Sequence, residues 1–347
     1  MFFLIRLFYI LCFVITYFLH AGSPIVLSTK KIAFEEFPEA FNPSLVKIDE
    51  GYLMAFRYMP NRWIYPALSY IGLVPLDASF APTAKPQLLK IRPRYSKVLP
   101  QAEDPRLFVH KGRIFLIYND NAEKRDPSPQ DRRDMYIAEI FHDKGNYTLS
   151  APLKLIYEEK YKKQLWQKNW LPFEYNGTML LVYSVSPHEI ISPNFVTGSC
   201  YKYDFTDFES SWDWGQLRGS TPPVLENGEY FAFFHSSIVT SSAASLDCEM
   251  YFYFMGAYTF SATPPFQVTK ISASPIVSDS FYTASSYYKR VIFPGGCVIT
   301  DSFIHVAYGK DDSSMWIATL DKAALKRSLI PVKPKSQIDN GGIKKLL

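Results

Sequence analysis

Short apolar runs, each preceded by a turn, recur along the chain from about residue 25 onward. The runs are rich in aromatic and β-branched residues, and no amphipathic helix longer than three turns separates them. They lie at 52–56, 114–118, 179–183, 230–234 and 303–308. The turns before them are Asp49-Glu50-Gly51, Lys111-Gly112, Asn176-Gly177, Asn227-Gly228 and Thr300-Asp301. A turn followed by such a run predicts a β-hairpin in each case.

The five hairpins begin near residues 51, 112, 177, 228 and 302, so their spacing is roughly 50 to 75 residues. Four strands with long loops fill such a period, which predicts an all-β fold, a five-bladed β-propeller over residues 23–347. A β-sandwich of repeated hairpins is the alternative, and the even recurrence favours the propeller. The polar and Pro-rich stretches 85–93, 121–134 and 186–198 are expected to be loops inserted between strands.

Composition narrows the class of protein. Of the 347 residues, 48% are apolar and 16% are aromatic, which supports a sizeable core and excludes long disorder. A formal charge of +4 is too small for a nucleic-acid-binding protein. The four cysteines lack C-x-x-C spacing and the six histidines lack i, i+4 spacing, so we expect no metal site. No Gly-rich phosphate loop precedes a helix, and no cofactor is predicted.

The N-terminal segment forms a separate unit. Residues 1–19 are apolar apart from Arg6 and Thr16, and small residues follow at 21–23. This pattern predicts a signal peptide over residues 1–22 or, because the cleavage site is poor, a retained signal anchor. We therefore expect a protein that is exported or anchored to a membrane through residues 1–22, in the periplasm, the secretory lumen or outside the cell.

Short polar clusters lie where loops meet the predicted strands. In Glu103-Asp104-Pro105-Arg106, Asp104 stands near a guanidinium, which suits a general acid or base and equally a β-turn with a local ion pair. In the second cluster Lys168 can hold an anion, and an exposed Trp170 can stack on a sugar face. The alternative there is a surface lysine beside a half-buried tryptophan.

Two further clusters follow toward the C-terminus. Arg218 opens a Gly- and Pro-rich segment, and His235 follows the next run, so we expect the two at opposite ends of one blade segment. The last cluster runs from Gly295-Gly296 to Tyr308 and Asp312, where glycines admit a ligand and a carboxylate pair suits sugar hydroxyls. A propeller would bring these clusters to one central funnel.

The serial order of these motifs resembles the β-mannoside phosphorylase family, glycoside hydrolase family 130, whose members are five-bladed propellers. The resemblance covers residues 38–321, and Glu-Asp-Pro-Arg at 103–106 is its most specific motif. The other motifs are Phe41-Asn42-Pro43 with Arg57, Lys168, the segment 218–223 with His235, Met255-Gly256-Ala257-Tyr258, Pro264-Pro265-Phe266, Ser274-Pro275-Ile276, Phe293-Pro294-Gly295-Gly296, and Tyr308-Gly309 with Asp312.

The resemblance implies an inverting attack on a β-mannoside with Asp104 as the proton donor. It implies that phosphate is held by Arg57, Arg106, Lys168 and His235. Arg218 is added to this set from its place in the third cluster. Asp312 would hold the sugar where the bond breaks, and further sugar contacts are expected from Asn42, Glu103, Trp170 and Tyr308. Phosphorolysis needs only one carboxylate because phosphate is already a nucleophile, so several cations around one acid are its expected signature.

Departures from the family pattern leave other readings open. The chain has Lys168-Asn169 where the family commonly has Lys-Asp, and Lys310 where a small residue usually stands. A hydrolase is one alternative, and it would need a second carboxylate from among Glu189, Asp247 and Glu249. A mannosyltransferase using a sugar phosphate or a nucleotide sugar is another. A third is a propeller that binds glycans or a protein partner without catalysis.

Overall fold

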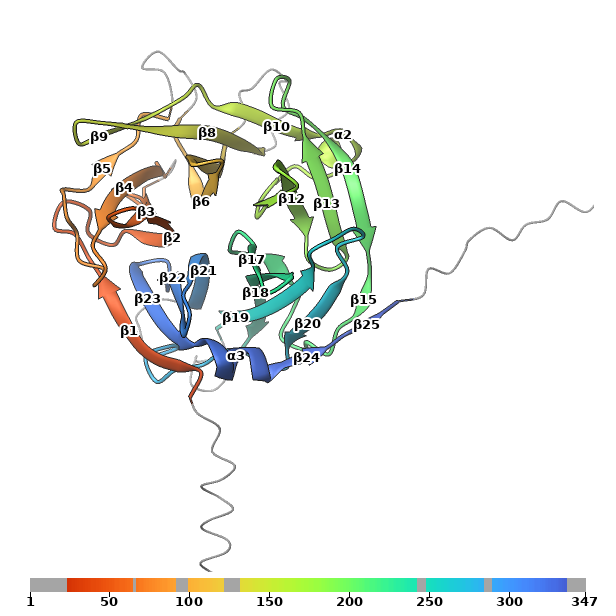
Figure 1. Ribbon diagram of the computed structural model, residues 1–347. Coiled ribbons are helices and arrows are strands. Elements are labelled where there is room, and N and C mark those ends of the chain that lie inside the picture. The colour runs from red at the N-terminus through yellow and green to blue at the C-terminus, as the bar shows by residue number, and fades with distance from the viewer. Residues whose placement is uncertain are drawn as a thin grey trace, which may run out of the picture.

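The chain folds into β-sheets arranged around a common axis, which Figure 1 shows as a nearly closed ring. The computed structural model describes residues 24–64, 67–91, 99–121, 132–241, 248–283 and 289–335. The helices within these ranges are short: α2 (Glu158–Tyr161) and α3 (Lys322–Ser328). The all-β class predicted from the sequence is therefore confirmed.

Antiparallel meanders of consecutive strands make up the ring. The first contains β2 (Phe41–Ile48), β3 (Gly51–Tyr58), β4 (Tyr70–Leu76) and β5 (Gln87–Leu88). The second contains β6 (Glu103–His110), β7 (Arg113–Asn121) and β8 (Arg133–Asp143), with β9 (Asn146–Leu149) and β10 (Leu153–Tyr157) paired to β8. The third contains β11 (Leu171–Tyr175), β12 (Thr178–Ser184), β13 (His188–Pro193) and β14 (Ser199–Thr206).

The remaining strands complete the circle. The fourth meander contains β18 (Glu229–Thr240), β19 (Met250–Ser261) and β20 (Val268–Ser272), with β16 (Arg218–Gly219) and β17 (Val224–Glu226) paired to β18. The last contains β21 (Lys289–Ile299), β22 (Phe303–Lys310), β23 (Ser314–Asp321) and β1 (Val26–Ile32). Short outer pairings add β24 (Leu329–Pro331) beside β20, and β15 (Phe208–Glu209) beside β25 (Lys333–Pro334).

Each hairpin read from the sequence is present. The runs 52–56, 114–118, 179–183, 230–234 and 303–308 lie in β3, β7, β12, β18 and β22, and each of these strands pairs with the strand just before it. The prediction of a loop at 186–198 is wrong in part, because this stretch contains β13. β13 begins with the polar residues His188 and Glu189, so its sequence does not look like a buried strand. Both side chains are nevertheless buried.

The ring closes through its first described strand. β1 lies antiparallel to β23, with Val26 opposite Leu320 and Ile32 opposite Met315. Segments from the two ends of the described chain thus share one sheet, as Figure 1 shows. This pairing covers an edge of β23 that would otherwise present unpaired backbone groups to another chain.

The strands near the axis are buried on both faces because each sheet packs against its neighbours in the ring. In β3 residues 52–56 are buried without interruption. Strands covered on both faces have continuous apolar runs instead of alternating ones, which explains the pattern in the sequence. Aromatic rings fill the spaces between sheets: the Phe173 ring centroid lies 4.9 Å from that of Tyr230 and 5.5 Å from that of Phe266.

The N-terminal segment predicted as a signal peptide or anchor, residues 1–22, lies outside the described residues. Within the ranges that the structure describes, no helix is long and apolar enough to cross a bilayer.

Two glycines make room for a phenylalanine ring on the adjacent strand. Gly72 lies opposite Phe56 in the β3–β4 pair, and Gly256 lies opposite Phe234 in the β18–β19 pair. A Cβ atom at either glycine would come within 2.3 Å of the ring. A glycine opposite a phenylalanine therefore allows close side-chain packing in both the first and the fourth meander.

We expect Gly256→Ala to lower the free energy of unfolding by about 1–3 kcal/mol, because the added methyl group overpacks the core against Phe234. Urea unfolding followed by circular dichroism measures the change. A second variant, Gly256→Ala with Phe234→Leu, should cost less than the sum of the two single changes, since the smaller side chain vacates the clash. Additive costs would contradict this account.

Candidate functional site

Bulges near the start of two inner strands present polar side chains to one another. β2 and β6 each gain one residue over their partner strand close to their N-terminal ends. Asn42 and Asp104 lie in these bulges with φ of 46° and 51°, a conformation that Asn and Asp tolerate better than most residues. Asn42 Nδ2 donates a hydrogen bond of 2.9 Å to Asp104 Oδ1. Bulges of this kind often orient side chains beside functional sites.

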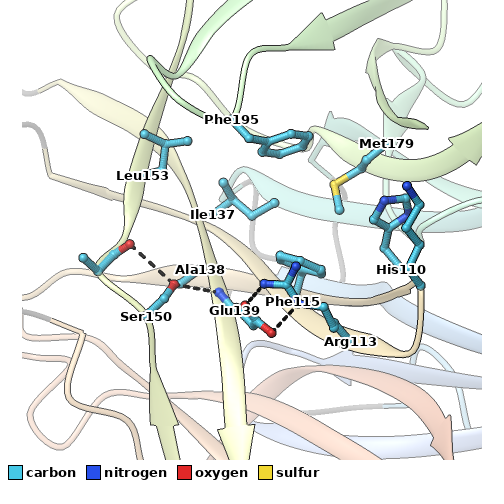
Figure 2. Close-up of a pocket in the computed structure, with 12 residues that line it drawn as sticks. His110, Arg113, Phe115, Ile137, Ala138, Glu139, Ser150, Leu153, Met179 and Phe195 are labelled. Atoms are coloured by element: carbon cyan, nitrogen blue, oxygen red, sulfur yellow. Dashed lines mark hydrogen bonds and ion pairs between the residues drawn. The ribbon is translucent and has the colours of Figure 1, made fainter. Parts of the chain in front are cut away.

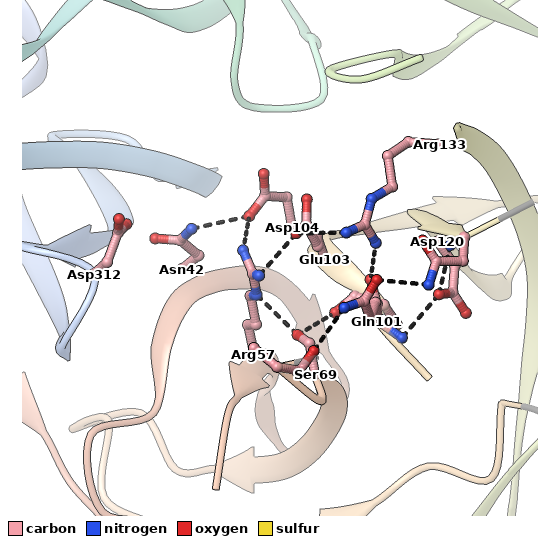
Figure 3. A network of polar contacts seen from close by, with 12 residues as sticks. Asn42, Arg57, Ser69, Gln101, Glu103, Asp104, Asp120, Arg133 and Asp312 are labelled. Atoms are coloured by element: carbon pink, nitrogen blue, oxygen red, sulfur yellow. Dashed lines mark hydrogen bonds and ion pairs between the residues drawn. The ribbon is translucent and has the colours of Figure 1, made fainter. Parts of the chain in front are cut away.

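The carboxylate of Glu103 is the meeting point of three cations. It accepts a hydrogen bond of 2.9 Å from Arg57 Nη2 in β3 and one of 2.9 Å from Lys168 Nζ, just before β11. Arg133 Nη2, from β8, lies 3.9 Å from Glu103 Oε1. Figure 3 shows Arg57 and Arg133 on either side of this carboxylate. Side chains from three meanders thus meet here, and we name Arg57, Glu103, Asp104, Arg133 and Lys168 the central cluster.

Asp104 shares the field of these cations. Arg57 Nη1 lies 3.7 Å from Asp104 Oδ1, and Arg57 Nε donates to Ser69 Oγ at 2.9 Å, which fixes the guanidinium. Burial on its own raises the pKa of both Glu103 and Asp104, but the charges of Arg57 and Lys168 outweigh it and leave both pKa values lowered. Both carboxyls are therefore ionised at neutral pH.

Arg106 is a buried cation beside the cluster. Its side chain is 2% exposed, and Nη1 donates to the Pro105 carbonyl at 3.0 Å. Its Nε and Nη2 have no hydrogen-bond partner among the described residues. Burial lowers its pKa to about 10, opposed by the charge of Asp104, so it stays charged. A buried guanidinium with two unpaired nitrogens favours an anion or water as partner.

His235 and Arg218 lie directly opposite one another on β18 and β16, so their expected placement at opposite ends of a blade segment is wrong. The antiparallel pairing of a short strand with a long one brings them together. The Nδ1 atom of His235 is 2.7 Å from Ser220 Oγ. Burial lowers the pKa of His235 well below its usual value, and the charges of Arg218, Arg106 and Lys168 lower it further. The imidazole is therefore neutral at neutral pH.

Asp312 lies beyond Asn42, on the side away from Asp104 (Figure 3). Its carboxylate forms an ion pair with Lys289, and its backbone carbonyl accepts a bond of 2.7 Å from Arg62 Nη1. Gly309 leaves space for Asn42, because a Cβ atom there would lie 2.2 Å from Asn42 Oδ1. The side chains from Asp312 through Asn42 to Asp104 and Arg133 thus follow one another across the site.

Two predicted sugar contacts lie apart from these groups. Trp170 was expected to be exposed, and this is wrong: it is 1% exposed and packs against Tyr183, with ring centroids 5.5 Å apart. Tyr308 is fully buried, with its ring centroid 5.1 Å from that of Phe281. Both side chains belong to the aromatic packing between strands.

Two residues at the site were missed by the sequence reasoning. Arg133 fell within the stretch 121–134 that was read as a loop, so its place at the start of β8 had no visible signal. Trp166 is 48% exposed, and Lys168 Nζ lies 4.7 Å from its ring centroid. Trp166 stands two residues before Lys168, and this position could have identified it, but Trp170 was chosen as the sugar contact instead.

Two of the three candidates for a second catalytic carboxylate lie in the described ranges, and neither forms a hydrogen bond or ion pair with the central cluster. Glu189 in β13 is buried and accepts a hydrogen bond of 2.7 Å from the Tyr157 hydroxyl. Glu249 is exposed just before β19, and Asp247 lies outside the described residues. Within the described part of the chain, no group of three or more His, Cys, Asp or Glu could hold a metal ion.

A pocket of about 410 Å³ lies at the opposite end of β6 from the acid pair (Figure 2). His110, Arg113 and Phe115 line one side of it, and Met179 and Phe195 line another. Two of its lining residues are already in ion pairs, Arg113 with Glu139 and His110 with Glu174. The buried Arg106 nitrogens without a hydrogen-bond partner among the described residues lie beside the central cluster, so we place the candidate site there.

No protein-family model and no curated protein sequence matches this chain. Solved structures do match. One represents the GH130 family of mannoside phosphorylases, which contains glycoside hydrolases that target β-1,2-mannosidic linkages in Candida mannan; it is 14% identical with a TM-score of 0.60, over 88% of this chain and 93% of that one. The resemblance read from the sequence is thus confirmed at the level of the fold.

Two structures from Leishmania mexicana have the same fold. A mannose phosphorylase in complex with phosphate ion is 12% identical with a TM-score of 0.57, over 90% of this chain and 93% of that one. A GDP-Man-dependent mannosyltransferase is 11% identical with a TM-score of 0.54, over 86% of this chain and 91% of that one. The fold is therefore shared by proteins named for hydrolysis, phosphorolysis and transfer.

We expect Glu103→Gln to lower the free energy of unfolding by about 3 kcal/mol, because it leaves buried cations without a charged partner. Sodium sulfate should restore stability to this variant more than to the unchanged protein, since the anion replaces the lost charge. Urea unfolding at several sulfate concentrations measures both effects. The matched control is Glu226→Gln, which removes the partner of Lys322 and Lys326 elsewhere. An equal sulfate response in both variants would argue against the site.

Sulfate affinity should rise as the pH falls from about 7 to 5. His235 is neutral because its pKa is lowered by burial and by nearby cations. A bound dianion offsets those cations and raises the pKa of His235, so binding takes up a proton and strengthens at lower pH, by at most about tenfold per pH unit. Calorimetric titration with sulfate, which stays a dianion in this range, measures the slope. His235→Asn should flatten it, and an unchanged slope would refute this role.

Proposed function

We propose that this chain is an inverting carbohydrate-active enzyme that cleaves β-mannosides by phosphorolysis, with Asp104 as proton donor. The central cluster carries the proposal: one acid pair surrounded by more cations than it can neutralise, with Arg106 and Arg218 adding to the excess. The five antiparallel meanders are, in this proposal, the blades of a five-bladed β-propeller. The repeated bulges and the closing pair β1–β23 support that count.

The excess of cations favours an anionic reactant. Lys168 and Arg57 are held 2.9 Å from the Glu103 carboxylate, so they are in place before any ligand arrives. Arg106 adds two buried nitrogen atoms without a partner in the described chain. Guanidinium and ammonium groups bind phosphate oxygens well, and like charges this close become favourable once an anion lies among them.

An anion in the cluster also supplies the acid. With its pKa lowered by Arg57 and Lys168, Asp104 is a carboxylate and has no proton to give. Phosphate bound among the same cations offsets their charge, raises the pKa of Asp104 and brings a proton of its own. A phosphate oxygen then bonds to the anomeric carbon as the bond from that carbon to the leaving oxygen breaks. Asp104 gives its proton to that oxygen, which yields an inverted sugar 1-phosphate and a shortened glycan.

Hydrolysis is supported less well. An inverting hydrolase activates water with a second carboxylate, roughly 6.5–9.5 Å from the acid. Glu103 is neutralised by its cations, and Glu189 in β13 accepts a hydrogen bond from the hydroxyl of Tyr157 in β10. Asp312, paired with Lys289, is placed to hold a sugar in this proposal.

Transfer from a sugar phosphate or nucleotide sugar is the second candidate. The observation that favours it is the same set of cations, which would hold a donor phosphate as well as inorganic phosphate. A GDP-mannose-dependent mannosyltransferase of this fold is among the matching structures. The two functions differ in which phosphate compound is consumed, and product analysis separates them.

The test is product analysis with purified protein and β-linked manno-oligosaccharides, with and without inorganic phosphate. We expect mannose 1-phosphate only when phosphate is present, and a loss of about 10²- to 10⁴-fold in kcat for Asp104→Asn. The exposed turn residue Asp301 offers a matched control, and Asp301→Asn should retain full activity. Free mannose regardless of phosphate would indicate a hydrolase. Turnover only with GDP-mannose would indicate a transferase.

A further inference from the structure

Trp166 combines a fixed position with an open surface. Backbone hydrogen bonds hold its segment to β8: the Arg133 nitrogen donates to the Leu165 carbonyl at 3.0 Å, and the Gln167 nitrogen donates to the Arg133 carbonyl at 2.9 Å. The indole itself is 48% exposed. An indole whose backbone is fixed on both sides in sequence, with about half of the residue's surface exposed, can offer a flat apolar face to a ligand.

The ring borders the central cluster. Lys168 Nζ lies 4.7 Å from the indole centroid and Arg133 Cζ lies 5.8 Å from it. Both cations also face the Glu103 carboxylate, Lys168 at 2.9 Å and Arg133 at 3.9 Å. Figure 3 shows Arg133 on one side of Asp104, and Asn42 and Asp312 on the other. Because its ring lies 5.8 Å from Arg133 Cζ, we take Trp166 to lie on the Arg133 side of Asp104.

Two glutamines, Gln164 and Gln167, lie close to Trp166 in the sequence. Gln164 is held by the Tyr183 hydroxyl, which donates to its Oε1 at 2.7 Å. The buried side chain of Gln167 donates to the Gln164 carbonyl at 2.9 Å, and its Oε1 has no hydrogen-bond partner among the described residues. An aromatic face beside an ammonium group and a guanidinium suits a pyranose, whose C–H bonds can contact the ring while its hydroxyls reach the polar groups.

We propose that Trp166 is the stacking platform for a sugar unit on the far side of the cleaved bond from Asp312, so that the site takes an oligosaccharide. This rests on the proposed function and specifies its substrate class. A chain with one sugar beside Asp312 passes Asp104, where its bond is cleaved, and continues onto the indole. Trp166 then determines affinity for the glycan and leaves the anion site unaffected.

The test compares two ligands, a β-linked mannotriose and sulfate, by calorimetric titration. All proteins carry Asp104→Asn so that the glycan is not consumed. We expect Trp166→Ala to weaken mannotriose binding about tenfold and to leave sulfate binding within about twofold, while Trp166→Phe restores most of the glycan affinity. The matched control is Trp214→Ala, since Trp214 is 39% exposed and packs against Phe254 instead of the cluster. That variant should bind both ligands normally.

The other possible results would contradict either the sugar platform or the proposed function, as follows. Weaker binding of sulfate and mannotriose alike would mean that the indole only positions Lys168 and Arg133. Unchanged mannotriose binding by Trp166→Ala would overturn the platform alone. Loss only of a nucleotide sugar's binding, measured with GDP-mannose, would assign the ring to a base instead of a sugar. If the Asp104→Asn chain with Trp166 intact binds no mannoside, the proposed function fails and the platform fails with it.

Discussion

The site depends on one buried carboxylate that must stay charged. Glu103 is 8% exposed, and a carboxylate this far from water is stable only when cations replace its hydration. Arg57, Arg133 and Lys168 supply them from the first, second and third meanders. The same contacts that neutralise Glu103 therefore fix the relative positions of three sheets at the axis, and any shift between those sheets would separate charges in a poorly solvated region.

The two neighbouring acids of the site, Glu103 and Asp104, have different surroundings. Glu103 takes most of the direct hydrogen bonds from the cations, whereas Asp104 is held by Asn42 and stands at 3.7 Å from Arg57. The carboxylate of Glu103 therefore mainly holds the surrounding cations in place. Asp104 keeps a carboxylate whose proton affinity responds to what occupies the surrounding cations. In the proposed reaction, Asp104 would therefore act as an acid only when an anion occupies the site.

Much of the fold could be predicted from the sequence because buried strands have a recognisable local pattern. Runs such as 230–234 are apolar without interruption, and a Gly-containing turn precedes most of them, so local chemistry alone identifies the second strand of each meander. β13 escaped because His188 and Glu189 are polar in sequence, although the fold buries both. Trp170 was misjudged for the opposite reason: its burial depends on Tyr183, which only the folded sheet brings near. Arg133 and Trp166 likewise meet through a bridge between distant segments.

The closing pair of β1 with β23 has a consequence for how the protein folds. β1 is among the first described segments to leave the ribosome, and its partner is among the last. The strand that seals the ring must therefore remain unpaired until nearly the whole chain has been made. Contacts of such long sequence separation form slowly because the loop between them must be ordered first. Ring closure should be the late step of folding, and an incompletely synthesised chain would expose the sheet edges that the finished molecule covers.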